Sequence, residues 1–308
     1  MTQAPKGMRI RERGTARHGA ATAGAIFLEC FAGCGELSKA VRRVGVQTDT
    51  PQDGLTGGTD FADNRQVLEL WEHWRRLRAA GLRLFFHFAP PCSTFSRARD
   101  RSWKTKLRSF SAPGGLDALE EKTKEANDIA KNTAHSINYL VTQLGASGSL
   151  EQPASSYMLP YLDQGGWLPP HGQVLLHQCR FGRPYRKPIV FLTFGDLDLS
   201  ALAKTCSSAT PCGRPFHTTL GFGESSTSLA AAYPTGLCAA YAGALFNQLT
   251  FDDDQDNDAL DRLEITANGV VRRHVDRGAV EPSQRVVRAR ADAASRAGRN
   301  PSYGQQAR

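Results

Sequence analysis

The sequence has no long hydrophobic run: none of its apolar stretches approaches the roughly 20 residues that a membrane-spanning helix needs. Residues 1–24 are rich in arginine but lack the apolar core of a secretory signal. The 7 cysteines are an odd number and show no paired disulfide spacing, so we expect reduced thiols. These absences predict an intracellular protein, nuclear or cytoplasmic, with no membrane partner, and leave its oligomeric state open.

Acidic residues are in deficit as well. The 38 Lys and Arg residues outnumber the 30 Asp and Glu residues, which gives a formal net charge of +8 and a pI of about 9.3. Such a charge favours a polyanionic partner, because Lys and Arg release counterions from phosphate backbones. The alternative is that the excess charge lies in arginine-rich tails.

Apolar and amphipathic segments alternate between residues 25 and 251. Short apolar runs predict strands at residues 25–31, 82–89 and 187–194. Residues 147–153 are predicted as a brief strand that ends at a charged residue. Helical spacing predicts helices at residues 37–45, 65–81, 116–144 and 226–249, and residues 171–182 fit either element. This alternation predicts an α/β domain with a mostly parallel sheet and helices on both faces. We expect disordered tails on either side, a basic one at 1–24 and an acidic, then arginine-rich one at 252–308.

Several candidate site residues follow the predicted strands. Gly33 and Gly35 lie between a strand and a helix, where they allow close approach of a ligand, although tight turn packing explains them equally well. Their spacing lacks the full G-x-G-x-x-G pattern, which disfavours a dinucleotide site. Asp53 or Asp49 is placed to bind ribose hydroxyls, and either also fits an ordinary turn. Ligands bind at the carboxyl ends of parallel strands, so we expect these segments to converge there.

Cys92 lies just past an apolar run, directly after Pro90 and Pro91. A structural cysteine would normally lie inside such a run as a small buried hydrophobe. Prolines stiffen the loop, and a cysteine becomes nucleophilic where nearby positive charge lowers its pKa. The arginines that follow, Arg97 and Arg99 among them, supply such charge or grip a phosphate.

Two further segments carry polar candidates. Glu151 ends a predicted strand, where a surface turn is the plain alternative. Residues 177–188 combine Gln178, Arg180 and Arg183 with two aromatic residues. That mixture suits contact with nucleic acid, although it also fits a solvated basic patch.

Taken in order, these segments resemble the DNA cytosine carbon-5 methyltransferases. "LECFAGCGEL" is similar to the first motif of that family, "APPCSTFS" to its Pro-Cys motif, "LEQPASS" to its Glu-Asn-Val motif and "QCRFGRPYRKP" to its Gln-x-Arg-x-Arg motif. The resemblance implies a Rossmann-like class I fold that binds S-adenosyl-L-methionine and methylates carbon 5 of cytosine in DNA.

The resemblance also implies residue roles. Cys92 would add to carbon 6 of the ring, Glu151 would bond N3, and Arg180 would hold the carbonyl side. The residues implied in cofactor binding are Phe31, Ala32, Gly33, Gly35, Leu37, Asp53, Asp60, Phe61 and Pro90. Those implied in nucleic-acid binding are Ser93, Arg97, Arg99, Gln178 and Arg183.

The sequence departs from the family pattern in several places. Glu29 replaces the usual Asp, Ser93 the usual Gln, and Gln152 with Pro153 the usual Asn-Val. Only some thirty residues separate Phe194 from Ser226, where the family carries a large target-recognition domain. Methylation of RNA, methyl transfer to another acceptor, and a catalytically inactive nucleic-acid-binding protein therefore remain alternatives.

Cys206, Cys212 and His217, with Cys179, form a possible zinc module. Their spacing, C-x5-C-x4-H, matches no familiar finger pattern. Loop cysteines and a polar loop histidine explain them as well, and we predict no metal site.

Overall fold

A computed structural model describes residues 24–218, 231–261, 263–265 and 271–273. The chain divides into two compact units, Met1–Asp254 and Gln255–Arg308. In the second unit, β7 (Leu263–Ile265) pairs antiparallel with β8 (Val271–Arg273). None of the helices described is long and apolar enough to cross a membrane.

The first unit is built on a six-stranded sheet with the order β2-β1-β3-β4-β6-β5. The strands are β1 (Ala25–Cys30), β2 (Gln47–Thr48), β3 (Arg83–Phe88), β4 (Ser147–Pro153), β5 (Gly172–His177) and β6 (Pro188–Phe194). The pairs β1–β2, β1–β3 and β3–β4 are parallel, and β6 lies antiparallel between β4 and β5. The expected α/β, mostly parallel, Rossmann-like architecture is confirmed.

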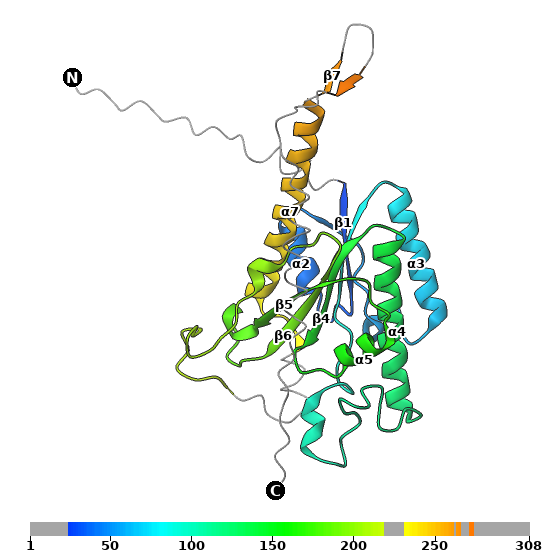
Figure 1. Cartoon of the computed structure of the whole chain (residues 1–308), viewed down its shortest axis with the longest axis vertical. Coiled ribbons are helices and arrows are strands. Elements are labelled where there is room, and N and C mark those ends of the chain that lie inside the picture. The colour runs from blue at the N-terminus through cyan, green and yellow to red at the C-terminus, as the bar shows by residue number, and fades with distance from the viewer. Residues whose placement is uncertain (1–23, 219–230, 262, 266–270, 274–308) are drawn as a thin grey trace, which may run out of the picture. The chain divides into compact units, whose positions relative to one another are not determined.

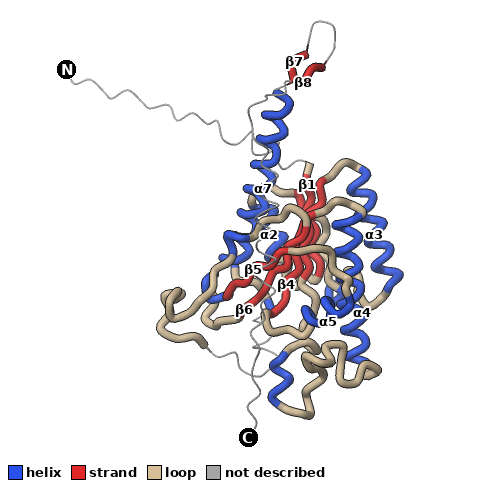
Figure 2. Tube along the Cα trace, in the orientation of Figure 1, coloured by secondary structure: helices blue, strands red, loops and turns tan. Residues whose placement is uncertain are grey.

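Helices cover both faces of this sheet (Figures 1 and 2). The helices are α2 (Glu36–Arg43), α3 (Asn64–Ala79), α4 (Glu121–Thr142), α5 (Met158–Gly165) and α7 (Thr235–Asp261). Apolar residues of α3, α4 and α5 pack in one core cluster, and those of α2 and α7 in another. The short 3-10 helices are η1 (Gly54–Thr56), η2 (Arg97–Arg101), η3 (Gln178–Phe181) and η4 (Ser200–Leu202).

Local chemistry explains where the elements begin. All six residues of β1 are buried, as a strand covered on both faces requires. The side chain of Asp63 accepts a hydrogen bond from the amide of Arg65 and caps α3. Val67, Leu70 and Trp74 are spaced at helical intervals, and they form the buried side of α3.

Two predicted helix starts lie several residues from those in the structure, and one segment that fitted either a helix or a strand is now assigned. Helix α4 begins at Glu121 rather than at residue 116, because the Glu120 side chain caps it by accepting from the amide of Thr123. Residues 171–182 form strand β5 followed by η3. Helix α7 begins after Pro234, whose carbonyl accepts from the amide of Cys238, and residues 226–230 of the predicted helix lie outside the described residues.

Candidate active site

A cavity of about 940 Å³ lies where the loops after β1, β2 and β3 meet the end of β4. The carboxyl ends of parallel strands share one edge of the sheet, which explains the convergence. The predicted site residues that line this cavity are Phe31, Ala32, Gly33, Leu37, Asp53, Asp60, Phe61, Pro90, Cys92, Ser93, Arg99 and Glu151. Most of the candidate site is therefore one continuous surface.

The loop after β1 has an unusual backbone. Phe31 has φ of 61°, the only positive φ at a non-glycine residue among those described, and Gly33 and Gly35 also have positive φ. A bulky residue in this region is strained by roughly 1–2 kcal/mol. The Phe31 ring lies against the Phe61 ring, with ring centroids 4.6 Å apart. These two rings line the cavity and form an apolar surface against which a flat ligand group can pack.

Gly35 has a structural role rather than a place in the cavity wall. It is the left-handed N-cap of α2 and makes no side-chain cap. Glu29 of β1 caps α2 instead, because its Oε2 accepts a hydrogen bond from the amide of Ser38 at 2.9 Å. Burial raises the pKa of Glu29, and hydrogen bonding from Ser38 opposes this shift. Glu29, which stands where the resembled family has Asp, also lines the cavity.

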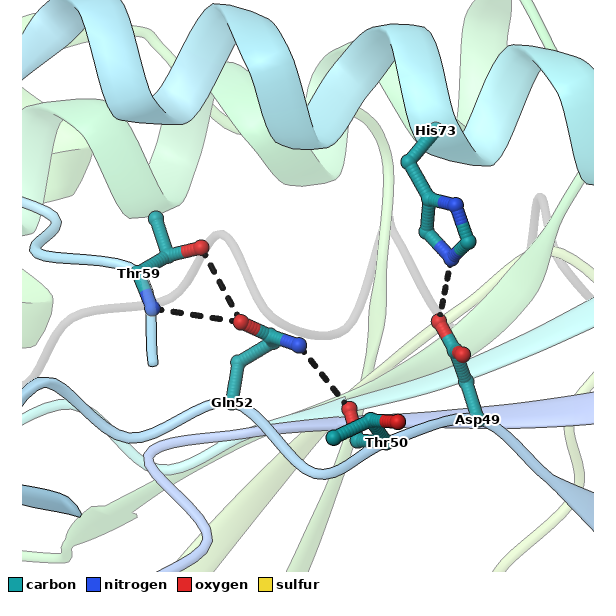
Figure 3. Close-up of polar contacts among 5 residues, drawn as sticks. All are labelled: Asp49, Thr50, Gln52, Thr59 and His73. Atoms are coloured by element: carbon teal, nitrogen blue, oxygen red, sulfur yellow. Dashed lines mark hydrogen bonds and ion pairs between the residues drawn. The ribbon is translucent and has the colours of Figure 1, made fainter. Parts of the chain in front are cut away.

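Asp53 joins the loops after β1 and β2. One carboxylate oxygen accepts from the amide of Gly33 at 2.8 Å, and the other accepts from the amide of Leu55 at 2.9 Å. Asp49 instead lies 2.7 Å from Nε2 of His73 on α3 and does not line the cavity (Figure 3). Of the two alternatives, Asp53 is therefore the one at the candidate site.

Hydrogen bonds made by Gln52 hold the loop after β2 in place (Figure 3). Its side-chain oxygen accepts from the amide and the hydroxyl of Thr59, and its side-chain nitrogen donates to the carbonyl of Thr50. Its backbone amide donates to the carbonyl of Glu29, and its carbonyl accepts from Ala32. Asp53 is thus held at the cavity by a loop that is bonded on both sides.

Cys92, Glu151 and Lys187 meet in the cavity wall. Burial raises the pKa of the Cys92 thiol, the negative charge of Glu151 raises it further, and Lys187 lowers it. Burial also raises the pKa of Glu151, against the opposing effects of Lys187 and a hydrogen bond from Tyr233. The expectation that arginines lower the Cys92 pKa is wrong, because burial and the nearby carboxylate dominate. Burial thus disfavours the charged forms of both the Cys92 thiol and the Glu151 carboxyl group.

A chain of buried polar groups ends at Glu151. Tyr241 and His87 each bond the hydroxyl of Ser149 at 2.8 Å, and the other imidazole nitrogen of His87 lies 2.9 Å from the Tyr233 hydroxyl. Tyr233 in turn bonds Glu151. One oxygen of Glu151, Oε1, is buried without a hydrogen-bond partner among the described residues. Glu151 thus lines the cavity and carries a buried oxygen that the described residues leave without a partner, which is unusual in a folded protein.

Four of the remaining predicted residues, Arg97, Gln178, Arg180 and Arg183, do not line the cavity. Arg180 is exposed and donates to the carbonyl of Pro211, so its predicted catalytic position is not observed. Arg183 donates to the carbonyl of Ala232 and so supports the segment that carries Tyr233. Gln178 is fully buried, because η3 turns its side chain inward, and it has no access to nucleic acid. Arg97 pairs with Asp100 at 3.6 Å.

The long connection between Cys92 and α4 is anchored by one buried arginine. Arg108 donates to the carbonyls of Thr94 and Pro113 and to the side chain of Asn127, and it packs 3.6 Å from the ring centre of Phe95. Around this anchor the connection exposes Trp103, which is 82% accessible, and several cations. Arg99 of the same connection lines the cavity and donates to the carbonyl of Ser93.

Sequence reasoning missed Lys187 and Tyr233 as site residues. Lys187 lies in the basic stretch, directly before β6, and only the register of that strand brings it to Glu151. Tyr233 is distant in sequence from Cys92, Glu151 and Lys187 and has no motif around it. No local signal identifies it.

Comparisons with protein-family models and with curated proteins give no match. Among solved structures, a methyltransferase of Entamoeba histolytica, EhMeth, aligns with 12% sequence identity and a TM-score of 0.31. The alignment covers 55% of this chain and 52% of that protein, so it spans about half of each.

Proposed function

We propose that this protein is an S-adenosyl-L-methionine-dependent methyltransferase that acts on carbon 5 of cytosine in DNA, with Cys92 as the nucleophile. The observation that carries the proposal is the meeting of Cys92, Glu151 and Lys187 in one cavity with an unsatisfied buried carboxyl oxygen. The motif resemblance in the sequence supports the choice of reaction.

The loops after β1 and β2 suit the cofactor. The Phe31 and Phe61 rings give an apolar surface for an adenine ring, and Gly33 allows close approach of the backbone. The Asp53 oxygens each hold one amide and keep further lone pairs for ribose hydroxyls. S-adenosyl-L-methionine would supply an electrophilic methyl group near Pro90.

The residues around Cys92 suit a covalent route. The thiolate of Cys92 would bond carbon 6 of the ring, which makes carbon 5 electron-rich enough to take the methyl group. Loss of the carbon-5 proton and elimination of the thiolate would then restore the ring. The base must first leave the helix stack to reach the cavity.

Glu151 and Lys187 would each contact a different atom of the ring. A protonated Glu151 would bond N3 and offset the electron density that builds there, and its raised pKa favours that form. Protonation also removes the negative charge that raises the Cys92 pKa. We assign to Lys187, rather than to Arg180, the contact with the ring carbonyl oxygen.

The nucleic acid would lie across the connection that follows Cys92. Its exposed Trp103 and its lysines combine stacking area with positive charge. Arg99 lies where this connection meets the cavity.

The decisive experiment is trapping on DNA that contains 5-fluorocytosine. That base cannot lose its carbon-5 substituent after methyl transfer, so an active enzyme stays attached. We expect a cofactor-dependent adduct that mass spectrometry maps to Cys92, no adduct with Cys92→Ser, and a normal adduct with Arg180→Ala. Cys34 is exposed and also lines the cavity, so the mapping must place the adduct on Cys92 and not on Cys34. Trapping on RNA alone would contradict the DNA assignment, and cofactor binding without transfer to either would contradict the enzyme.

A further inference from the structure

Three cysteines and a histidine gather at a second place, away from the cavity lining. Cys179 lies in η3, and Cys206, Cys212 and His217 lie in the connection after η4. Their three sulfur atoms and one imidazole nitrogen all lie within 4.8 Å of one another. Nε2 of His217 is 3.3 Å from Sγ of Cys212 and 3.7 Å from Sγ of Cys206.

These separations fit one metal ion. Zinc bonds thiolate sulfur at about 2.3 Å and imidazole nitrogen at about 2.0 Å, so a tetrahedral site places its ligand atoms roughly 3.5–3.8 Å apart. All the cysteines described are free, so no disulfide accounts for the cluster. Three soft sulfur ligands with one imidazole are the donor set that selects zinc over magnesium or calcium. We propose that Cys179, Cys206, Cys212 and His217 bind a structural zinc ion.

The surrounding backbone supports a structural role. Residues 203–218 contain no helix or strand, and a connection of this length in a compact domain normally needs a tether. The amide of Cys206 donates to Nδ1 of His177 at 2.9 Å, and the amide of Thr218 donates to the carbonyl of Pro184 at 2.9 Å. Both ends of the connection thus return to the segment that carries Cys179.

The ligands also come from two separate parts of the chain. Cys179 precedes β6, whereas the other three ligands follow it, so the ion would close a loop around that strand. Cys179 and Cys206 are buried, while Cys212 and His217 are partly exposed, which leaves an entry path for the ion. Four protein ligands fill a tetrahedral shell, and a filled shell indicates a structural rather than a catalytic zinc.

The stabilised segment lies where the resembled family carries its recognition domain. Arg214 donates to the carbonyl of Gly182 at 2.9 Å, and Arg180 donates to Pro211 within the same connection. Zinc would therefore fix two cations together with η3. This role does not depend on whether the cavity catalyses methyl transfer.

Metal content of the purified full chain tests the proposal directly. We expect about one zinc per chain by elemental mass spectrometry. Cobalt substitution should give the visible bands of tetrahedral thiolate coordination. Cys212→Ser and His217→Ala should lose most of the zinc, and Cys34→Ser, which changes an exposed thiol outside the cluster, should keep it. A folded wild-type chain that binds neither zinc nor cobalt under reducing conditions would overturn the proposal.

A second measurement covers variants that fail to fold. Thiol alkylation of the wild-type chain, followed by peptide mapping, should show Cys206 and Cys212 protected until a chelator is added. Cys34 should react equally with and without the chelator. Protection that does not change on chelation would contradict a metal at this place.

Discussion

The hydroxyl of Tyr233 lies 2.9 Å from Nε2 of His87, a fully buried imidazole near the carboxyl end of β3. Because Ser149 occupies the other ring nitrogen, the imidazole donates to one hydroxyl and accepts from the other. Tyr233 is thereby fixed against Glu151. A buried histidine of β3 thus positions the candidate catalytic acid.

Replacing His87 should change the acid stability of the protein. Burial lowers the pKa of His87 to about 3 from its usual 6.5, so the unfolded chain binds a proton that the folded chain refuses. His87 therefore contributes stability above about pH 6.5, and this is lost toward pH 3 at up to about 1.4 kcal/mol per pH unit. Urea unfolding across the upper part of this window should show a shallower slope for His87→Asn. His135→Gln removes an exposed imidazole and should keep the wild-type slope.

Glu151→Gln should show the opposite dependence. The raised pKa of Glu151 means that its contribution to stability is present below the usual pKa near 4.5 and is lost as pH rises through the folded value. The amide does not titrate, so the variant should gain relative to wild type as pH rises, by at most about 1.4 kcal/mol per pH unit. Denaturant unfolding at several pH values measures this difference. A constant difference at all pH values would show that Glu151 is ionised in the same way in both states.

Asp53→Ala should weaken cofactor binding. Two backbone amides lose their acceptor, and the loop after β1 loses its link to the loop after β2. We expect at least a tenfold loss of affinity for S-adenosyl-L-methionine by calorimetry, which is about 1.4 kcal/mol. Asp49→Ala, which breaks only the contact with His73, should lower the melting temperature and leave the affinity within about twofold. Equal losses in the two variants would contradict the assignment of Asp53.

Replacing both Lys104 and Lys106 by alanine should weaken DNA binding in a salt-dependent way. Each lysine that neutralises a phosphate contributes about 0.9 to the slope of log affinity against log salt, so the slope should fall by roughly 2. Fluorescence anisotropy at several salt concentrations measures it. The matched control replaces Arg65 and Arg75, which pair with Glu69 and Glu72 on α3. An unchanged slope in the lysine variant would exclude this connection as the DNA contact.

Local patterns predicted much of the fold. Buried apolar runs predicted the positions of β1, β3 and β6, because a strand that is covered on both faces is largely apolar along its length. Strand β4 was predicted without such a run. The antiparallel direction of β6 was not predictable from its composition, since pairing direction depends on the connections around a strand. The two-residue strand β2 is too short to leave any pattern.

Some residues of the candidate site were predictable from the sequence, and others were not. Phe31, Asp53 and Cys92 lie next to strand ends in the sequence, so their convergence followed from the expected topology. Lys187 and Tyr233 come close to Glu151 only through tertiary packing. Arg180 instead donates to the carbonyl of Pro211, in a loop that is distant in sequence. The Cys179 cluster was named from the sequence as a possible zinc module, but its ligands lie on both sides of β6 at no regular interval, so the sequence alone did not favour a metal site.

The cavity walls come from segments that meet only in the completed fold, between Glu29 and Tyr233. A small molecule that contacts all of these segments binds the folded chain and not the unfolded chain. Raising its concentration therefore shifts the folding equilibrium toward the folded state by mass action. At one hundred times its dissociation constant such a compound adds about 2.7 kcal/mol to the stability of the native state. The supply of methyl donor would then influence how long the protein survives proteolysis, as well as how fast it works.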